Sequence, residues 1–228
     1  VRSRAPAGYQ WVFDRVREER LQNNRPAYRE RWWVFAEPRA MFRNAANGLQ
    51  RIVITPRTAK HRFFMFDRAD VQFESEIVGF GVEDSLCLGV LSSGVHMAWV
   101  QATAASFGAY VGNIRYNQTV CFDPYPFPAA SEKQSALIRT LAEHLDTHRK
   151  RQQAQHPGLT LTGMYNVLEK LRSGEPLTAK ERVLHEQGLV SVLRQLHDDL
   201  DAAVLSAYGW SDLLPLLRIA HGNDAPAE

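Results

Sequence analysis

The spacing of hydrophobic residues changes from helical to strand-like early in the chain. Apolar side chains recur at helical spacing within Tyr9–Leu21, and Pro26, a residue favoured in a first helical turn, predicts a second helix that ends before Pro38. Short apolar runs farther along predict three strands, at 51–54, 62–66 and 76–80. This part of the chain therefore predicts a mixture of helices and strands.

The middle of the chain contains a long stretch without charged residues, from Ser85 to Ile114. A membrane span needs about 20 consecutive apolar residues, and polar or small residues interrupt this run, namely Ser92, Ser93, Gly94, His96, Gln101, Thr103 and Ser106. We therefore expect no membrane partner and a buried helix from Ser85 to about Ala104, capped by Asp84. The mixed polar and apolar residues at 114–122 predict a half-exposed strand.

A boundary is predicted at the proline-rich sequence DPYPFP, residues 123–128, because proline is excluded from helix interiors and central strands. Beyond it the hydrophobic spacing is helical throughout, with one stripe formed by Leu137, Ile138, Leu141 and Leu145. The T-x-x-E pattern from Thr178 to Glu181 predicts a helix start, and Gly209 predicts a helix end.

These patterns together predict an α+β fold with two domains. A chain of 228 residues is long enough for two domains that each have a core. The predicted order is a mixed α/β domain at 1–128, which includes N-terminal helices within 9–37, followed by a small all-α helical domain at 129–228.

The cysteine content predicts the compartment of the protein, and the first residue predicts how the chain relates to a longer protein. Cys87 and Cys121 are the two cysteines, both in apolar surroundings, and no signal peptide is visible. We therefore expect a reducing compartment, the cytoplasm, and no disulfide framework, although the two cysteines could still form one bridge. Because the chain begins with Val1 rather than Met, we expect it to be an excised piece of a longer protein.

The net charge of +2 hides a strong asymmetry along the chain. Residues 1–62 carry 13 Arg and one Lys against five acidic residues, a net charge of +9, whereas residues 63–128 carry −5 and residues 129–228 carry −2. A positive surplus confined to one segment is typical of a surface that binds a polyanion, with nucleic acid as the first candidate. An arginine-rich solvated face would explain the same composition.

Two polar segments contain the residue types that contact DNA. The basic segment TPRTAKHR (Thr55–Arg62) supplies cations and hydroxyl donors for phosphates, and the amide segment GNIRYNQT (112–119) supplies Arg, Asn and Gln, which read base edges in the major groove. The candidate phosphate-binding residues are Arg43, Arg57, Lys60, His61 and Arg62. The candidate base-reading residues are Asn113, Arg115, Asn117 and Gln118. The same residue types are also common in ordinary turns.

Motifs that could indicate catalysis are incomplete. The Gly79-Phe80-Gly81 sequence lacks the third glycine of a dinucleotide-binding turn, and His144 and His148 have metal-ligand spacing without a third ligand, so we interpret them as solvated histidines. The DPYPF sequence has Tyr125 in place of the second proline of a DNA amino-methyltransferase motif, which favours a linker whose rings pack on the domain. We therefore predict a non-catalytic chain that holds no metal and no cofactor.

Five segments, in order and covering nearly the whole chain, resemble the C-terminal part of the type IIL restriction-modification enzymes, the MmeI-like family. They are RWWVFAEPR, IVITPRTAKHRFFMF, LGVLSSGVHMAWV, RYNQTVCFDPYPFP and the long block that begins LTGMYNVLEKLRSGEPLT. The resemblance implies that residues 1–128 are a DNA target recognition domain and that residues 129–228 are the C-terminal helical domain. It further implies that part of the base contacts come from Arg115–Thr119.

The resemblance also implies a parent protein. Its upstream part would be a bacterial, S-adenosylmethionine-dependent DNA adenine N6-methyltransferase, with or without a fused endonuclease, whereas the fragment itself lacks catalytic motifs. The resulting hypothesis is a sequence-specific module that binds double-stranded DNA and adjoins the methyltransferase domain. The alternative is a protein-interaction module, in which Trp32, Trp33, Phe35 and the C-terminal helices dock on a methyltransferase domain or subunit without reading bases.

Overall fold

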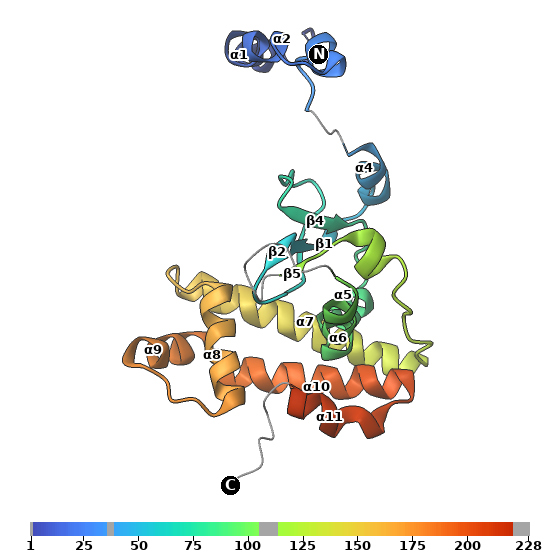
Figure 1. Ribbon diagram of the computed structural model, residues 1–228, viewed down its shortest axis with the longest axis vertical. Helices are drawn as coiled ribbons and strands as arrows, with labels where there is room; N and C mark the ends of the chain where they lie inside the picture. Colours follow the sequence, from blue (N-terminus) through green and yellow to red (C-terminus); the bar gives the residue numbers. More distant parts are fainter. Residues whose placement is uncertain (1, 36–38, 105–113, 221–228) are drawn as a thin grey trace. The chain divides into compact units, whose positions relative to one another are not determined.

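The computed structural model describes residues 2–35, 39–104 and 114–220 (Figure 1). The chain forms two compact units, Val1–Asn44 and Ala45–Glu228. Helices and small antiparallel sheets confirm the predicted α+β class.

The N-terminal unit consists of short helices. Their bounds are α1 (Pro6–Arg15), α2 (Arg17–Leu21), α3 (Pro26–Glu30) and the start of α4 (Ala40–Ala46). The predicted helix at Tyr9–Leu21 is divided at Val16, and the helix that begins at Pro26 ends at Glu30, because Arg31 leaves helical geometry. Helices α1, α2 and α3 contain no buried residue, and Trp32 is 8% exposed, with its ring 5.6 Å from that of Tyr9.

We expect removal of residues 1–39 to leave the second unit folded. Since the first three helices bury no side chain, their loss should shift the midpoint of thermal unfolding by no more than about 3 °C. Circular dichroism melting of the full and shortened chains measures this shift. A fall of more than about 10 °C would show that residues 1–39 supply core contacts to the second unit.

The second unit begins with a three-stranded antiparallel sheet. Its strands are β1 (Arg51–Pro56), β3 (Met65–Arg68) and β4 (Ile77–Phe80), in the order β3-β1-β4. Val53 of β1 lies opposite Phe66 of β3 and Phe80 of β4, and all three side chains are buried. The three predicted strands are therefore present, although the second begins at Met65 instead of residue 62.

The uncharged stretch forms two helices where one was predicted. Helix α5 (Ser85–Ser92) ends at Ser93, whose extended backbone interrupts the run and whose side chain caps α6 (Gly94–Thr103). Asp84 caps α5 as predicted, since its Oδ1 accepts a hydrogen bond from the Leu86 N–H at 2.9 Å. In the described part of the chain, no helix combines the length and the apolar character that a membrane crossing requires.

The C-terminal part is helical, as predicted. Its elements are α7 (Glu132–Gln155), α8 (Leu161–Ser173), α9 (Ala179–Gly188), α10 (Val190–Tyr208), a 3-10 turn (Ser211–Leu213) and α11 (Leu214–Ala220). Thr178 and Glu181 form the predicted capping box, and Gly209, with φ 74°, ends α10. The predicted stripe on α7 is only partly buried: Ile138 and Leu145 enter the core, whereas Leu137 is 52% exposed.

Helix α7 binds the β3 edge of the sheet, so both sides of residue 128 pack within one compact unit. The Phe66 N–H donates to Asp146 at 3.1 Å, and Arg149 Nη1 donates to the Phe64 carbonyl at 2.8 Å. The predicted boundary at residue 128 separates two kinds of secondary structure, and as a functional division it stays a prediction.

Candidate nucleic-acid interface

Two residues from each of the polar segments singled out in the sequence pair as a short two-stranded ribbon. Strands β2 (Thr58–Ala59) and β5 (Ile114–Arg115) pair antiparallel, with Thr58 opposite Arg115. The Tyr116 N–H also donates to the Arg57 carbonyl at 2.7 Å. Thr58 and Arg115, which are 57 residues apart in the sequence, are therefore exposed on the same ribbon.

Arg62 holds this ribbon together from within. Its guanidinium donates to the Pro56 carbonyl, to the Arg57 carbonyl at 3.4 Å and to the Ile114 carbonyl at 2.6 Å, and it lies over the Tyr116 ring. Burial lowers the pKa of Arg62 to about 10, so the side chain remains protonated at neutral pH. Because Arg62 donates hydrogen bonds to carbonyl groups on both segments of the ribbon, it fixes their positions relative to each other.

The ribbon rests on an aromatic core. Tyr116 is fully buried, its hydroxyl hydrogen-bonds to His96 Nε2 at 3.1 Å, and its ring meets Phe64 edge-on at 5.5 Å. Burial lowers the pKa of His96 to about 3, so this histidine is neutral. Since Tyr116 points inward, Arg115 and Asn117 on either side of it are exposed, as side-chain alternation in an extended segment requires.

The predicted strand at 114–122 is wrong beyond its first residues. The Asn117 side chain accepts a hydrogen bond from the Thr119 N–H at 3.1 Å and caps a short π-helix, Gln118–Phe122. Gln118 is exposed and donates to Asp123 at 3.3 Å. Local capping by Asn117 thus ends the extended conformation and places Gln118 on a helical turn.

The basic segment also contacts helix α8. Lys60 Nζ lies 2.7 Å from Glu169 Oε2 and 3.3 Å from Asn166 Oδ1, and His61 Nε2 lies 2.7 Å from the same amide oxygen. The His61 ring stacks against Tyr165, with the ring centres 6.1 Å apart. Two candidate phosphate-binding residues are therefore held against a helix of the C-terminal part.

The remaining candidates occupy separate positions. Arg57 is half-buried and its Nε donates to the Ser75 carbonyl at 2.5 Å. Arg43 is exposed on α4 and belongs to the N-terminal unit. Asn113 lies outside the described residues.

Comparisons with known proteins give one kind of match. Protein-family models and curated protein sequences yield none. A solved structure does match: the type IIL restriction-modification enzyme MmeI, determined in complex with DNA, with a TM-score of 0.62, 20% sequence identity and 94% of this chain covered. The chain shares its fold with part of MmeI. It spans 25% of the MmeI chain.

The fold shared with MmeI identifies no individual site residue. The candidate DNA-binding residues are therefore supported by their positions and contacts in this structure. Sequence reasoning missed Asn166 and Glu169, which the structure places beside Lys60. Both residues belong to the sequence MYNVLEK, within the long block that resembles the MmeI-like family. That resemblance could have indicated them as site residues.

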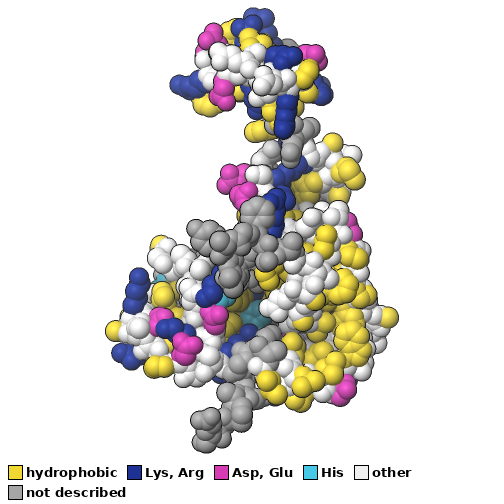
Figure 2. Space-filling model, viewed as in Figure 1, with side chains coloured by type: hydrophobic (Ala, Val, Ile, Leu, Met, Phe, Trp, Pro, Cys, Tyr) yellow, Lys and Arg dark blue, Asp and Glu magenta, His cyan; other side chains and the backbone are white. Residues whose placement is uncertain are grey.

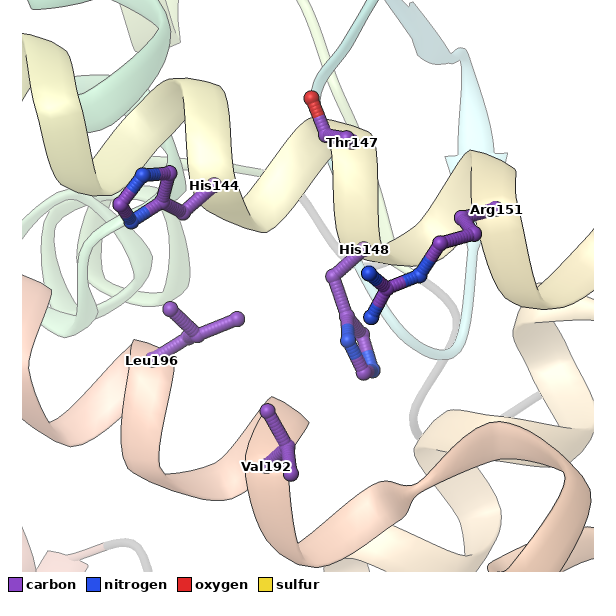
Figure 3. Close-up of a pocket in the computed structure, with 6 residues that line it drawn as sticks. All are labelled: His144, Thr147, His148, Arg151, Val192 and Leu196. Atoms are coloured by element: carbon purple, nitrogen blue, oxygen red, sulfur yellow. The ribbon is translucent and has the colours of Figure 1, made fainter.

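A pocket of about 250 Å³ lies between α7 and α10 (Figure 3). Its lining residues are His144, Thr147, His148, Arg151, Val192 and Leu196. His148 is buried and its Nε2 hydrogen-bonds to the Gly188 carbonyl at 3.0 Å, so the expectation of two solvated histidines is wrong for this residue. Across the described residues, no group of three or more His, Cys, Asp or Glu side chains could hold a metal ion.

The proline-rich sequence packs as a linker, as expected. Tyr125 is 6% exposed, its ring lies 4.4 Å from that of His96, and its hydroxyl is 2.9 Å from that of Tyr208. Phe127, the other ring within this sequence, is 41% exposed and lies 5.3 Å from the Tyr125 ring.

Proposed function

We propose that this chain is the sequence-specific recognition module for double-stranded DNA in a DNA N6-adenine methyltransferase of the type IIL kind, and that the module itself is non-catalytic. The pairing of β2 with β5, which brings the basic and amide segments together, carries the proposal. A two-stranded ribbon has the dimensions to enter the major groove of B-form DNA. Further support comes from the fold shared with MmeI, which was solved with DNA.

The proposal gives each candidate a role. Lys60 and His61 bind phosphates, with Arg57 and Arg43 as further backbone contacts, while Arg62 positions the ribbon. Arg115 reads a guanine edge through paired hydrogen bonds, and the amide side chains of Asn117, Gln118 and Asn113 approach adenine edges. S-adenosylmethionine and the catalytic motif would belong to the methyltransferase domain upstream in the parent chain.

The test compares Lys60→Ala with Arg115→Ala. Fluorescence anisotropy on random-sequence duplexes at ~50 and ~200 mM salt, with sequencing of the bound fraction, measures affinity, salt slope and base preference. We expect Lys60→Ala to weaken all duplexes alike and reduce the salt slope by about 1. We expect Arg115→Ala to reduce discrimination at one base pair by about 1–3 kcal/mol.

Lys133→Ala is the matched control, because it removes an exposed cation from α7. It should leave both affinity and base preference close to those of the unaltered chain. A uniform loss of affinity in Arg115→Ala would contradict its role as a base reader. Absence of binding at ~50 mM salt would contradict the whole proposal.

A specific surface favours the alternative of a protein-interaction module that docks on a methyltransferase domain. On the face shown in Figure 2, hydrophobic side chains gather at the lower right, where Figure 1 places α6, α10 and α11. The exposed apolar residues of this C-terminal region include Trp210, Leu213, Leu216 and Ile219. The two functions are compatible if this surface packs on the parent protein while the ribbon reads DNA.

A further inference from the structure

Helix α8 places a carboxylate within the proposed phosphate-binding surface. Glu169 Oε2 lies 2.7 Å from Lys60 Nζ and 3.9 Å from His61 Nε2. Asn166, one helical turn earlier, brings its Oδ1 within hydrogen-bonding distance of both basic side chains. Glu169 Oε2 thus accepts a hydrogen bond from Lys60 and faces His61. The Asn166 side chain lies beside it.

The geometry around this oxygen suits a phosphate. Charge-assisted hydrogen bonds from lysine to carboxylate and to phosphate oxygens have the same length, about 2.7–2.9 Å. Asn166 Oδ1 accepts from the Lys60 ammonium, which fixes one direction of that group and leaves other N–H donors for an anion. Lys60 can therefore donate to a phosphodiester oxygen at the same distance at which it donates to Glu169.

The carboxylate is easily displaced, whereas the groups around it are firmly supported. The Lys60 and Glu169 side chains are 52% and 56% exposed, and exposed ion pairs contribute little stability. The His61 side chain is 14% exposed and stacks on Tyr165, which is buried and contacts Arg149 and His197. A DNA phosphate could replace Glu169 without rearranging the core beneath the site.

We infer that Lys60, His61 and Asn166 form a binding site for one phosphate of the DNA backbone, and that Glu169 occupies this site until DNA displaces it. The inference rests on the proposed function and extends the DNA-binding surface from the ribbon to α8. Because Glu169 competes equally with every duplex, it lowers the affinity for all sequences alike and leaves the discrimination between sequences to the base contacts made by the ribbon.

The test is Glu169→Gln in the full 228-residue chain, with random-sequence duplexes as the probe. At ~50 mM salt we expect affinity to rise about two- to fivefold for all sequences, and the salt slope to steepen, since Lys60 becomes available to a phosphate. In a Lys60→Ala background the same substitution should give no such gain. Asn166→Ala should weaken all duplexes alike.

Glu186→Gln is the matched control, because it removes an equal charge from an exposed position on α9. Equal gains from Glu169→Gln and Glu186→Gln, or an equal gain with and without Lys60, would overturn the inference while leaving the proposed function intact. Failure of the unaltered chain to bind any duplex would overturn both. Circular dichroism confirms that each variant is folded.

Discussion

Replacing Arg149 with alanine is expected to lower the free energy of unfolding by about 3–5 kcal/mol. Arg149 is 1% exposed, donates to the Phe64 carbonyl at 2.8 Å, and contacts the Tyr165 hydroxyl and His197 Nε2. Alanine would leave these buried polar groups without their partner and would open a cavity. Urea denaturation followed by circular dichroism measures the loss.

Arg151→Ala provides the control for this experiment. Arg151 is exposed on the same helix, two residues farther along, so its removal should change stability by no more than about 0.5 kcal/mol. A loss below about 1 kcal/mol in Arg149→Ala would show that the buried network contributes little to holding the chain at Phe64 against α7. Because Tyr165 also supports His61, a folded Arg149 variant should bind DNA more weakly as well.

The second large effect concerns the pH dependence of stability and the buried Asp201. Burial raises the pKa of this carboxyl to about 7, and one carboxylate oxygen accepts a hydrogen bond from the Gly94 N–H at 2.6 Å. An unfolded aspartate has a pKa of about 3.9. The stability that the protonated carboxyl contributes is therefore fully present below about pH 4 and lost as the pH rises to about 7.

Asp201→Asn keeps an acceptor for Gly94 and removes the titrating proton. At pH 8 we expect the asparagine variant to be more stable than the unaltered chain by about 2–4 kcal/mol, and at pH 4 we expect the two to be similar. Chemical denaturation at both pH values measures the difference. Asp199→Asn, an exposed position on the same helix, should change stability by less than about 0.5 kcal/mol at either pH.

If the unaltered chain proved as stable as Asp201→Asn at pH 8, the buried carboxylate would be compensated by neighbouring charge. The guanidinium of Arg172 acts in that direction, since it lowers the pKa of Asp201, but burial has the larger influence.

Sequence patterns predicted those elements whose causes are local. The hydrophobic run at 51–54 became β1, Asp84 and the Thr178–Glu181 box began helices, and Gly209 ended one. Each of these signals acts within a few residues, through a cap or through burial of one face of a strand. The resemblance to the MmeI-like family correctly anticipated the fold that the chain shares with part of MmeI.

Two errors arose where a local hydrogen bond competed with the hydrophobic pattern. Ser93 caps α6 and so divides the apolar run, and Asn117 caps a π-helix and so ends the strand at 114–122. Serine and asparagine side chains offer the backbone such alternatives to regular structure. Hydrophobic spacing alone gave no sign that these caps would form.

The sequence by itself determined the α+β class, the basic and amide segments, and the change to helical structure after the prolines. Only the tertiary structure decided that Thr58 lies opposite Arg115 and that Arg62 joins the two segments of the ribbon. It also decided that Asn166 and Glu169 of α8 lie beside Lys60. Lys60 and Glu169 are 109 residues apart, and their meeting depends on how the sheet and the helices pack around a shared core. Residue spacing encodes local structure, whereas a binding surface depends on contacts between distant segments.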